Sequence, residues 1–303
     1  AKRVLGIDIT ETGEDETGRV LDLLAMHPST ARYVCRKLCI RLIGDDPPDS
    51  IVEAAATVFN DQWEAPDQLA QVVRRIILSD EFKDSANWGA KAKRPFETVM
   101  GAVRSCGGFT SHLVMPQPFS DSAANRLLGE NYYFSQSLYW YLDDTGHMPF
   151  SFETPDGFPD KKSAWLGSTP LIMTWRVLNA LSLSYHPDDP TVEDSPWHEF
   201  LPVDAVAVTK AQLTANQRTA AQIVDLWVNR YLGYDAALPA TPQLDSSVRT
   251  ALVSFMQQDA AGPDTVLDLD VVSGGSDAWN SYVVQRLQVL VACIGMLPDN
   301  LLR

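Results

Sequence analysis

Apolar residues recur at every third or fourth position in one segment of this sequence after another. The stretch "STARYVCRKLCIRLIG", residues 29–44, shows the pattern at Ala31, Val34, Cys35, Leu38, Cys39 and Leu42. This spacing places the apolar side chains on one face of an α-helix. The chain has no alternation of strand and helix patterns, no internal repeat and no low-complexity tract. The sequence therefore predicts an all-α fold.

Proline, glycine and capping residues divide the helical pattern into separate segments. Ser50 and Glu53 form a predicted capping box, in which each side chain satisfies a free backbone N–H at a helix start. His27, which precedes a proline, is expected to cap the helix that follows it. From these signals we expect helices at about 20–26, 29–43, 50–59, 66–77, 94–106, 120–142, 165–185, 209–232, 244–259 and 277–295.

The helical segments suggest how the chain is organised. Residues 1–19 are polar and contain glycine, so we expect an extended N-terminal segment. Residues 20–145 form a first helical region, 146–165 an ordered loop rich in proline and aromatic residues, and 166–303 a second helical region. We expect both regions to pack into one multi-helix, bundle-like domain with long irregular Pro/Gly-rich connections.

Charge and hydropathy restrict the partners that the chain can bind. The 303 residues carry a formal net charge of −15, which repels nucleic acid and anionic membranes, so neither is expected as the main partner. No run of 18 apolar residues is present, so no transmembrane segment is expected. The opening "AKRVLGIDIT" has no initiator Met and no apolar signal core, so we expect a processed or truncated beginning.

The sequence lacks the common signatures of metal and nucleotide enzymes. The four cysteines match no zinc spacing, and no H-E-x-x-H pattern occurs. The phosphate-binding patterns G-x-G-x-x-G and G-x-x-x-x-G-K-[ST] and the nucleophile pattern G-x-S-x-G do not occur. We therefore expect no metal site and no cofactor. Cys35 and Cys39 are expected to be small buried residues of one helix.

The loop "GHMPFSFETPDGFPDKKSAW", residues 146–165, has the most distinctive local composition. Two of its carboxylates facing each other across a groove would supply the acid and the base that glycoside hydrolysis requires. Aromatic side chains nearby would suit the apolar faces of sugar rings. The candidate catalytic residues are His147, Glu153, Asp156, Asp160 and, on a separate helix, Glu97; the candidate binding residues of the loop are Phe158 and Trp165.

A structural interpretation of the same loop competes with the enzymatic one. Its prolines restrict the backbone, its aromatic residues fill gaps in the helical core, and Asp156-Gly157 forms a turn. The positions of the carboxylates separate the two hypotheses. A pair about 5–10 Å apart across an open cleft favours an enzyme. Carboxylates that are dispersed on the surface or held in ion pairs favour a scaffold, and the sequence leaves the choice open.

Two further groups of residues are candidates for binding. Glu97 and Arg104 lie seven positions apart, hence near one face of a helix, and with Lys93 they could form a buried charge network or bind an anionic ligand. The run "NYYFSQSLYWYL", residues 131–142, points its aromatic side chains all around a helix. Such a helix is either fully packed or meets another chain through outer residues, of which Tyr139 and Trp140 are candidates.

Several stretches resemble one bacterial family, and they follow that family's order over nearly the whole chain. They are "HPSTARYVCRKL", "DDPP", "LSDEF", "KAKRPFETVMGAVRSCG", "GHMPFSFETPDGFPDKKSAWL", "TWRVLNAL" and "LPDNLLR". Together they resemble the large bacterial family catalogued as domain of unknown function 1800. The resemblance implies a helical fold, a bacterial source and an exported or cell-envelope setting. It supplies no catalytic residue, and Cys35 and Cys39 depart from its usual aliphatic or small residues.

The resemblance also suggests what the chain assembles with. Members of that family are usually longer, and this chain resembles their C-terminal portion. We therefore expect a companion N-terminal portion, or another protein chain, as the partner. The function expected from sequence is a structural or interaction component of an exported or envelope assembly. The alternatives are a polysaccharide hydrolase or lyase that uses carboxylates of the loop, with carbohydrate as the ligand, and a carrier of a small ligand.

Overall fold

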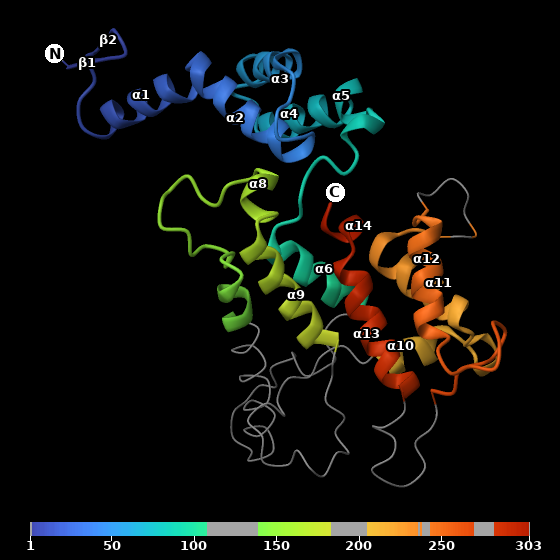
Figure 1. Ribbon diagram of the computed structural model, residues 1–303. Coiled ribbons are helices and arrows are strands. Elements are labelled where there is room, and N and C mark those ends of the chain that lie inside the picture. Colours follow the sequence, from blue (N-terminus) through green and yellow to red (C-terminus); the bar gives the residue numbers. More distant parts are fainter. Residues whose placement is uncertain are drawn as a thin grey trace, which may run out of the picture. The chain divides into compact units, whose positions relative to one another are not determined.

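The structure is a computed structural model that describes residues 2–107, 139–182, 205–235, 237, 243–269 and 282–302. The described chain is helical except for a short N-terminal hairpin, which confirms the predicted all-α fold (Figure 1). Most of the expected helix from 120 to 142 lies outside the described residues, although residues 139–144 are helical. Among the described helices, none is long and apolar enough to cross a membrane.

The chain divides into two compact units that are not continuous in sequence. Unit 1 contains Ala1–Ala92 and Pro159–Ala164, and unit 2 contains Lys93–Phe158 and Trp165–Leu302. The chain therefore leaves unit 1 after Ala92, returns to it for six residues and leaves it again. That both helical regions form a single domain stays a prediction.

Unit 1 begins with an antiparallel hairpin of β1 (Lys2–Val4) and β2 (Ile7–Ile9). Leu5 and Gly6, the two turn residues, both have positive φ, as a tight two-residue hairpin turn requires. Helix α1 (Glu14–Ala25) follows and begins well before the predicted start at Val20. Three acidic residues in its first turn explain the earlier start, because negative charge stabilises the positive end of a helix dipole.

The core of unit 1 is built by helices α2 (Pro28–Leu42), α3 (Asp49–Asp61) and α4 (Gln68–Ile77). The His27 imidazole caps α2, as predicted, with Nδ1 accepting a hydrogen bond of 3.1 Å from the Ser29 N–H. Cys35 and Cys39 are fully buried within this core. The short helices α5 (Asp80–Lys83) and η1 (Ser85–Asn87) complete the unit.

The predicted capping box at the start of α3 is wrong. The helix begins at Asp49 after Pro48, so Ser50 already lies inside the first turn. The Ser50 hydroxyl donates to Glu81 Oε1 at 3.3 Å, and Glu53 pairs with Arg32 at 2.7 Å. The sequence pattern was present, but the proline fixes the helix start one residue earlier.

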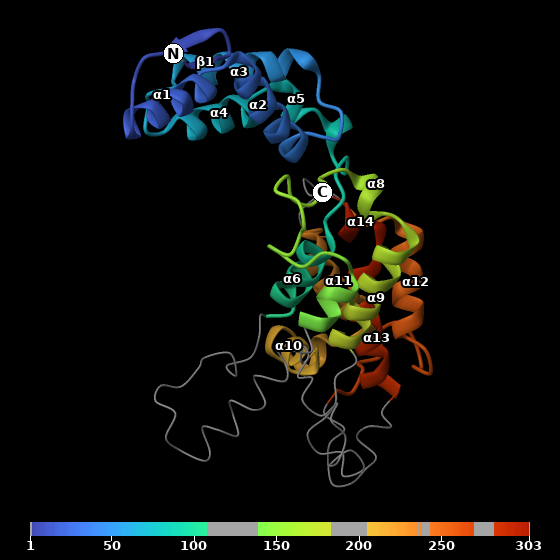
Figure 2. The same ribbon diagram turned by 90° about the vertical axis from the view of Figure 1, so that its left-hand side faces the viewer.

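Unit 2 is a bundle of helices around α13. Its elements are α6 (Pro95–Ser105), helical residues 139–144, the end of α8 (Lys162–Trp165), α9 (Ser168–Ser182), α10 (Ala205–Gln212), η3 (Ala215–Gln217), α11 (Ala220–Leu232), α12 (Ser246–Met256), α13 (Tyr282–Met296) and α14 (Pro298–Leu301). Helix α13 packs against α9, α10, α11 and α12 (Figures 1 and 2). Trp227 of α11 is fully buried in this core, and its indole Nε1–H donates to Thr209 Oγ1 at 3.0 Å.

The single helix predicted over 209–232 is three elements, α10, η3 and α11. Thr214 and Thr219 each form a capping box with the glutamine three residues later, Gln217 and Gln222. Each box satisfies free N–H groups at a new helix start, so the backbone turns twice where the apolar pattern continues.

The buried thiols should resist chemical modification. Burial raises the pKa of Cys35, Cys39 and Cys106 to about 11, and all three side chains are inside the protein, whereas Cys293 is exposed. Burial also raises the pKa of Cys293, but its side chain is accessible, so with iodoacetamide at about pH 8 we expect labelling of Cys293 in the folded chain and labelling of the other three only after unfolding in urea. Peptide mass spectrometry measures the four rates, and fast labelling of Cys35 in the folded chain would contradict the prediction.

Candidate functional site

The loop that follows the helical residues 139–144 is anchored at its start. Gly146 has φ +73°, and its N–H donates to the Asp143 carbonyl at 2.8 Å, which ends the helix in the left-handed conformation that glycine adopts most easily. The next residue, His147, is only 3% exposed. The loop therefore turns inward at the point where the helix ends.

The His147 imidazole lies among aromatic rings contributed by three parts of unit 2. Its ring centroid is 4.7 Å from that of Phe158, 4.9 Å from that of Trp165 and 6.4 Å from that of Phe96. The Phe158 and Phe96 contacts are edge-to-face, an arrangement that aromatic quadrupoles favour. Phe152 packs on Phe158 at 4.7 Å. We call these five residues the aromatic cluster.

His147 also completes the start of helix α6. Proline at the first position of that helix has no N–H, and the N–H of Phe96, the next residue, donates to His147 Nδ1 at 3.2 Å. Because this nitrogen accepts a hydrogen bond, it carries no proton. A candidate catalytic histidine thus acts as an N-terminal cap for a helix that lies 51 residues earlier in the chain.

Glu97 is bound at the same helix start. Its carboxylate accepts from the Arg94 N–H at 3.0 Å and from Arg94 Nη2 at 2.9 Å. Lys93 Nζ donates to Asn300 Oδ1 at 3.2 Å, and Arg104 is exposed in the last turn of α6. Among the described residues, Glu97 thus binds Arg94 and Lys93 binds Asn300. The network that was predicted to join these two residues with Arg104 is not seen there.

The three loop carboxylates lie in different environments. Glu153 and Asp156 are exposed, and Asp156 lies in a turn closed by the Gly157 N–H, which donates to the Thr154 carbonyl at 3.2 Å. Asp160 is half-buried and belongs to unit 1. The turn predicted at Asp156-Gly157 is present, and Asp160 is held in ion pairs.

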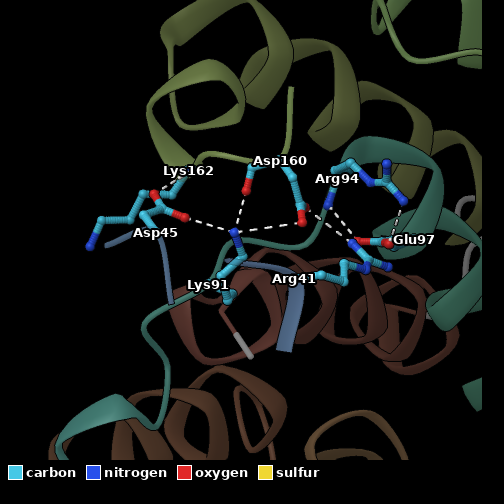
Figure 3. Close-up of polar contacts among 7 residues, drawn as sticks. All are labelled: Arg41, Asp45, Lys91, Arg94, Glu97, Asp160 and Lys162. Carbon is cyan, nitrogen blue, oxygen red and sulfur yellow. Dashed lines mark hydrogen bonds and ion pairs between the residues drawn. The ribbon is translucent and has the colours of Figure 1, made fainter. Parts of the chain in front are cut away.

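Asp160 takes part in a cluster of charges around Lys91, whose side chain is 3% exposed (Figure 3). Lys91 Nζ donates to Asp45 Oδ1 at 2.7 Å and to the backbone carbonyl of Asp160, and it lies 3.9 Å from Asp160 Oδ2. Arg41 Nη1 donates to Asp160 Oδ1 at 3.2 Å, and the Lys162 N–H donates to Asp45 Oδ2 at 2.8 Å. We call these five residues the Lys91 cluster.

The charges of the Lys91 cluster stabilise the ionised form of Asp45. Burial by itself would raise the pKa of the Asp45 carboxyl. The hydrogen bonds from the Lys91 ammonium and the Lys162 N–H outweigh burial, so the pKa lies below its ordinary value. Two cations, Lys91 and Arg41, thus face two carboxylates: Asp45 accepts from Lys91 and from the Lys162 N–H, and Asp160 accepts from Arg41 and lies 3.9 Å from the Lys91 ammonium.

Unit 2 also exposes large apolar side chains near the loop. Tyr139 and Trp140 are 44% and 61% exposed, and their rings contact each other edge-to-face at 5.4 Å. Phe150, at the loop turn, is fully exposed. Helix α9, whose Val177 belongs to the same apolar cluster as Leu142, exposes Ile172 and Trp175 as well. We call Tyr139, Trp140, Phe150 and Trp175 the exposed aromatic set.

In the part of the chain that the structure describes, no three His, Cys, Asp or Glu side chains group closely enough to hold a metal ion. The charged residues that do gather, those of the Lys91 cluster, already satisfy one another. Chemically, the described geometry offers ion pairing, helix capping and apolar contact.

Comparison with models of protein families identifies the family of this chain. The model of the family described as "Protein of unknown function (DUF1800)" matches residues 1–295. The chain belongs to this DUF1800 family. The resemblance seen in the sequence motifs is thereby confirmed over nearly the whole chain. No curated protein and no solved structure matches it.

Of three residues of the Lys91 cluster that lie in DUF1800 motifs, the sequence analysis selected Asp160 and missed Asp45 and Lys91. Asp45 begins "DDPP", Lys91 begins "KAKRPFETVMGAVRSCG", and Asp160 lies in the loop motif. Those three motifs meet in the Lys91 cluster. The only sequence signal for this cluster was the presence of Lys91 and Asp45 in two of the quoted motifs. Their contact could not be seen from sequence, because 46 residues separate Lys91 from Asp45.

Proposed function

We propose that this DUF1800 chain is a structural or interaction component of an exported or cell-envelope assembly in a bacterium. Its exposed aromatic set would bind another protein. The observation that carries the proposal is the exposure of Trp140 and Phe150, at 61% and 105%, together with the ring contact between Trp140 and the exposed Tyr139. Aromatic side chains are enriched at protein interfaces because they bury a large area with few rotatable bonds.

The loop carboxylates support a scaffold over a polysaccharide hydrolase. Asp160 is held by Lys91 and Arg41, so it is engaged in ion pairs. Glu153 and Asp156 are exposed, and His147 is buried as a helix cap. A glycosidase needs two carboxylates placed across one cleft, one of them with a raised pKa. We therefore propose that the loop 146–158 acts as a packed connection of unit 2 whose outer aromatic residues contact a partner.

The test is the composition of the native particle together with a matched pair of variants. We expect the chain, 33.5 kDa alone, to be isolated from its source at a larger mass with a companion protein in fixed stoichiometry. Tyr139→Ser with Trp140→Ser should weaken that association at least about 30-fold, since interface aromatics contribute about 2 kcal/mol or more each. Native mass spectrometry and titration of the purified companion provide the readout.

Trp88→Ser is the control for this experiment, because Trp88 is 69% exposed and lies in unit 1. It should bind the companion as the unchanged chain does. A native particle containing this chain alone would contradict the proposal, as would equal binding by the double variant. Release of sugars from polysaccharide that is lost in Glu153→Gln with Asp156→Asn would support the hydrolase instead.

A further inference from the structure

The segment Pro159–Ala164, which we call the strap, belongs to unit 1 although the chain on either side of it belongs to unit 2. None of its side chains is buried: Asp160 and Ala164 are half-buried, and the other four residues are exposed. The apolar core of unit 1 consists of residues from α2, α3 and α4 with Ile43, and it includes no strap residue. Apolar burial therefore contributes little to holding the strap in place.

Polar bonds hold the strap instead. Figure 3 shows that Lys91 and Arg41 bind Asp160, and that the Lys162 N–H, at the start of α8, donates a hydrogen bond to the Asp45 carboxylate. Each of these bonds involves Lys91, Asp160 or the carboxylate of Asp45. These bonds of the strap are charge-assisted, so each is stronger than a hydrogen bond between neutral groups. They all depend on the same few ions, so loss of one charge weakens several of them.

The charges around Lys91 balance only while both carboxylates are ionised. Lys91 and Arg41 face Asp45 and Asp160, and at the rim the exposed Lys161 lies 3.8 Å from Asp46. The Lys162 ammonium also acts on Asp45. If Asp45 loses its charge, the buried Lys91 ammonium loses the counter-ion at 2.7 Å. A buried, uncompensated charge is strongly unfavourable, so the strap would move to let water reach Lys91.

We propose that the strap is a releasable clasp, held closed by Lys91 with Asp45 and Asp160, and opened by loss of carboxylate charge while the α2–α4 core stays folded. Segments with little buried apolar area open locally at a lower free energy than the core of the same unit. The strap meets that condition, and the core, with fully buried Val52, Val72 and Ile76, does not.

The direction of the acid effect follows from Asp45. Its pKa is lower in the folded chain than the ordinary value of 3.8. Its carboxylate therefore stabilises the closed strap above about pH 4, and that contribution is lost as the pH falls through the folded pKa. Acid should open the strap below about pH 4 and leave it closed at neutral pH.

Amide hydrogen exchange tests the clasp directly. In the unchanged chain we expect the Lys162 amide, bonded to Asp45, to be protected at about pH 6. After correction for intrinsic exchange, its protection should fall as the pH is lowered from about 4 to about 2, while amides of α3 keep theirs. Asp45→Asn, which keeps an acceptor but removes the charge, should show the low protection already at about pH 6.

Asp22→Asn is the control, because Asp22 is an exposed aspartate of α1 in the same unit. It should leave exchange of the strap unchanged. Lys91→Met should expose the strap to trypsin at Lys161 and Lys162, with Lys83→Met as its exposed lysine control. The proposal is overturned if the strap and α3 lose protection together, or if Asp45→Asn exchanges as the unchanged chain does. The exchange measurement at low pH uses the unchanged chain, so it tests the proposal even if Lys91→Met fails to fold.

Discussion

Replacing Trp227 by Ala should lower the free energy of unfolding of this protein by about 4 to 5 kcal/mol, the upper end for removal of a buried aromatic side chain. Trp227 is 0% exposed in the core of unit 2 and contacts the Tyr231 ring at a centroid distance of 6.3 Å. The substitution leaves a cavity between helices that cannot move closer, because α11 also packs against α6, α12 and α13. It also removes the donor to Thr209 Oγ1.

Urea unfolding followed by far-ultraviolet circular dichroism measures this loss. Trp88→Ala is the control, since that indole is 69% exposed, and it should change the free energy of unfolding by less than about 0.5 kcal/mol. Trp227→Phe should fall between the two, because it fills part of the space and leaves Thr209 without the indole donor. Equal stability of the two alanine variants would show that Trp227 is not a core residue.

Replacing His147 by Ala should cost about 3 kcal/mol, the second largest effect that we expect. The substitution removes a ring that contacts Phe96, Phe158 and Trp165, and it leaves the Phe96 N–H without its acceptor. Loss of aromatic packing and the desolvation of an unpaired N–H each contribute about 1 to 2 kcal/mol. Thermal and urea unfolding measure the sum.

Two further variants separate these contributions. His147→Asn can keep an acceptor for the Phe96 N–H and loses the ring, whereas His147→Phe keeps a ring and loses the acceptor. Each should cost about half as much as His147→Ala. His27→Ala, which removes a half-exposed cap of the same chemical kind from α2, should cost about 1 kcal/mol. If His147→Ala costs no more than His27→Ala, the aromatic cluster contributes nothing to stability.

The helical fold was predictable because it depends on local patterns. The apolar spacing of α2 and the proline at the first position of α6 both mark helices that the structure contains. Helix ends were less predictable, since competing signals occur within a few residues. At α3 a proline overrode a capping box, whereas at Thr214 and Thr219 two capping boxes overrode a continuous apolar pattern. In each case the sequence contained both signals, but it did not indicate which of them would determine the helix end.

The candidate site was predictable in composition and not in arrangement. The loop at 146–165 stood out by its proline and aromatic content, and in the structure its Phe158 and Trp165 pack against His147, whereas its Phe150 is exposed. The role of His147 depends on a helix start far away in the chain, and the Lys91 cluster joins three separate segments. Contacts between distant segments follow from the packing of the whole unit, which no single motif encodes.

Because the chain returns to unit 1 at residues 159–164, recombination within the gene can separate parts of that unit. A crossover after Ala92 would exchange nearly all of unit 1 and yet leave behind the hexapeptide that Lys91 binds, because that piece is encoded some seventy codons later. Offspring of such an exchange would carry an ammonium from one parent and its acidic counterpart from the other. Between parents that differ at Lys91 or Asp160, such an exchange would therefore separate residues that pair within one chain.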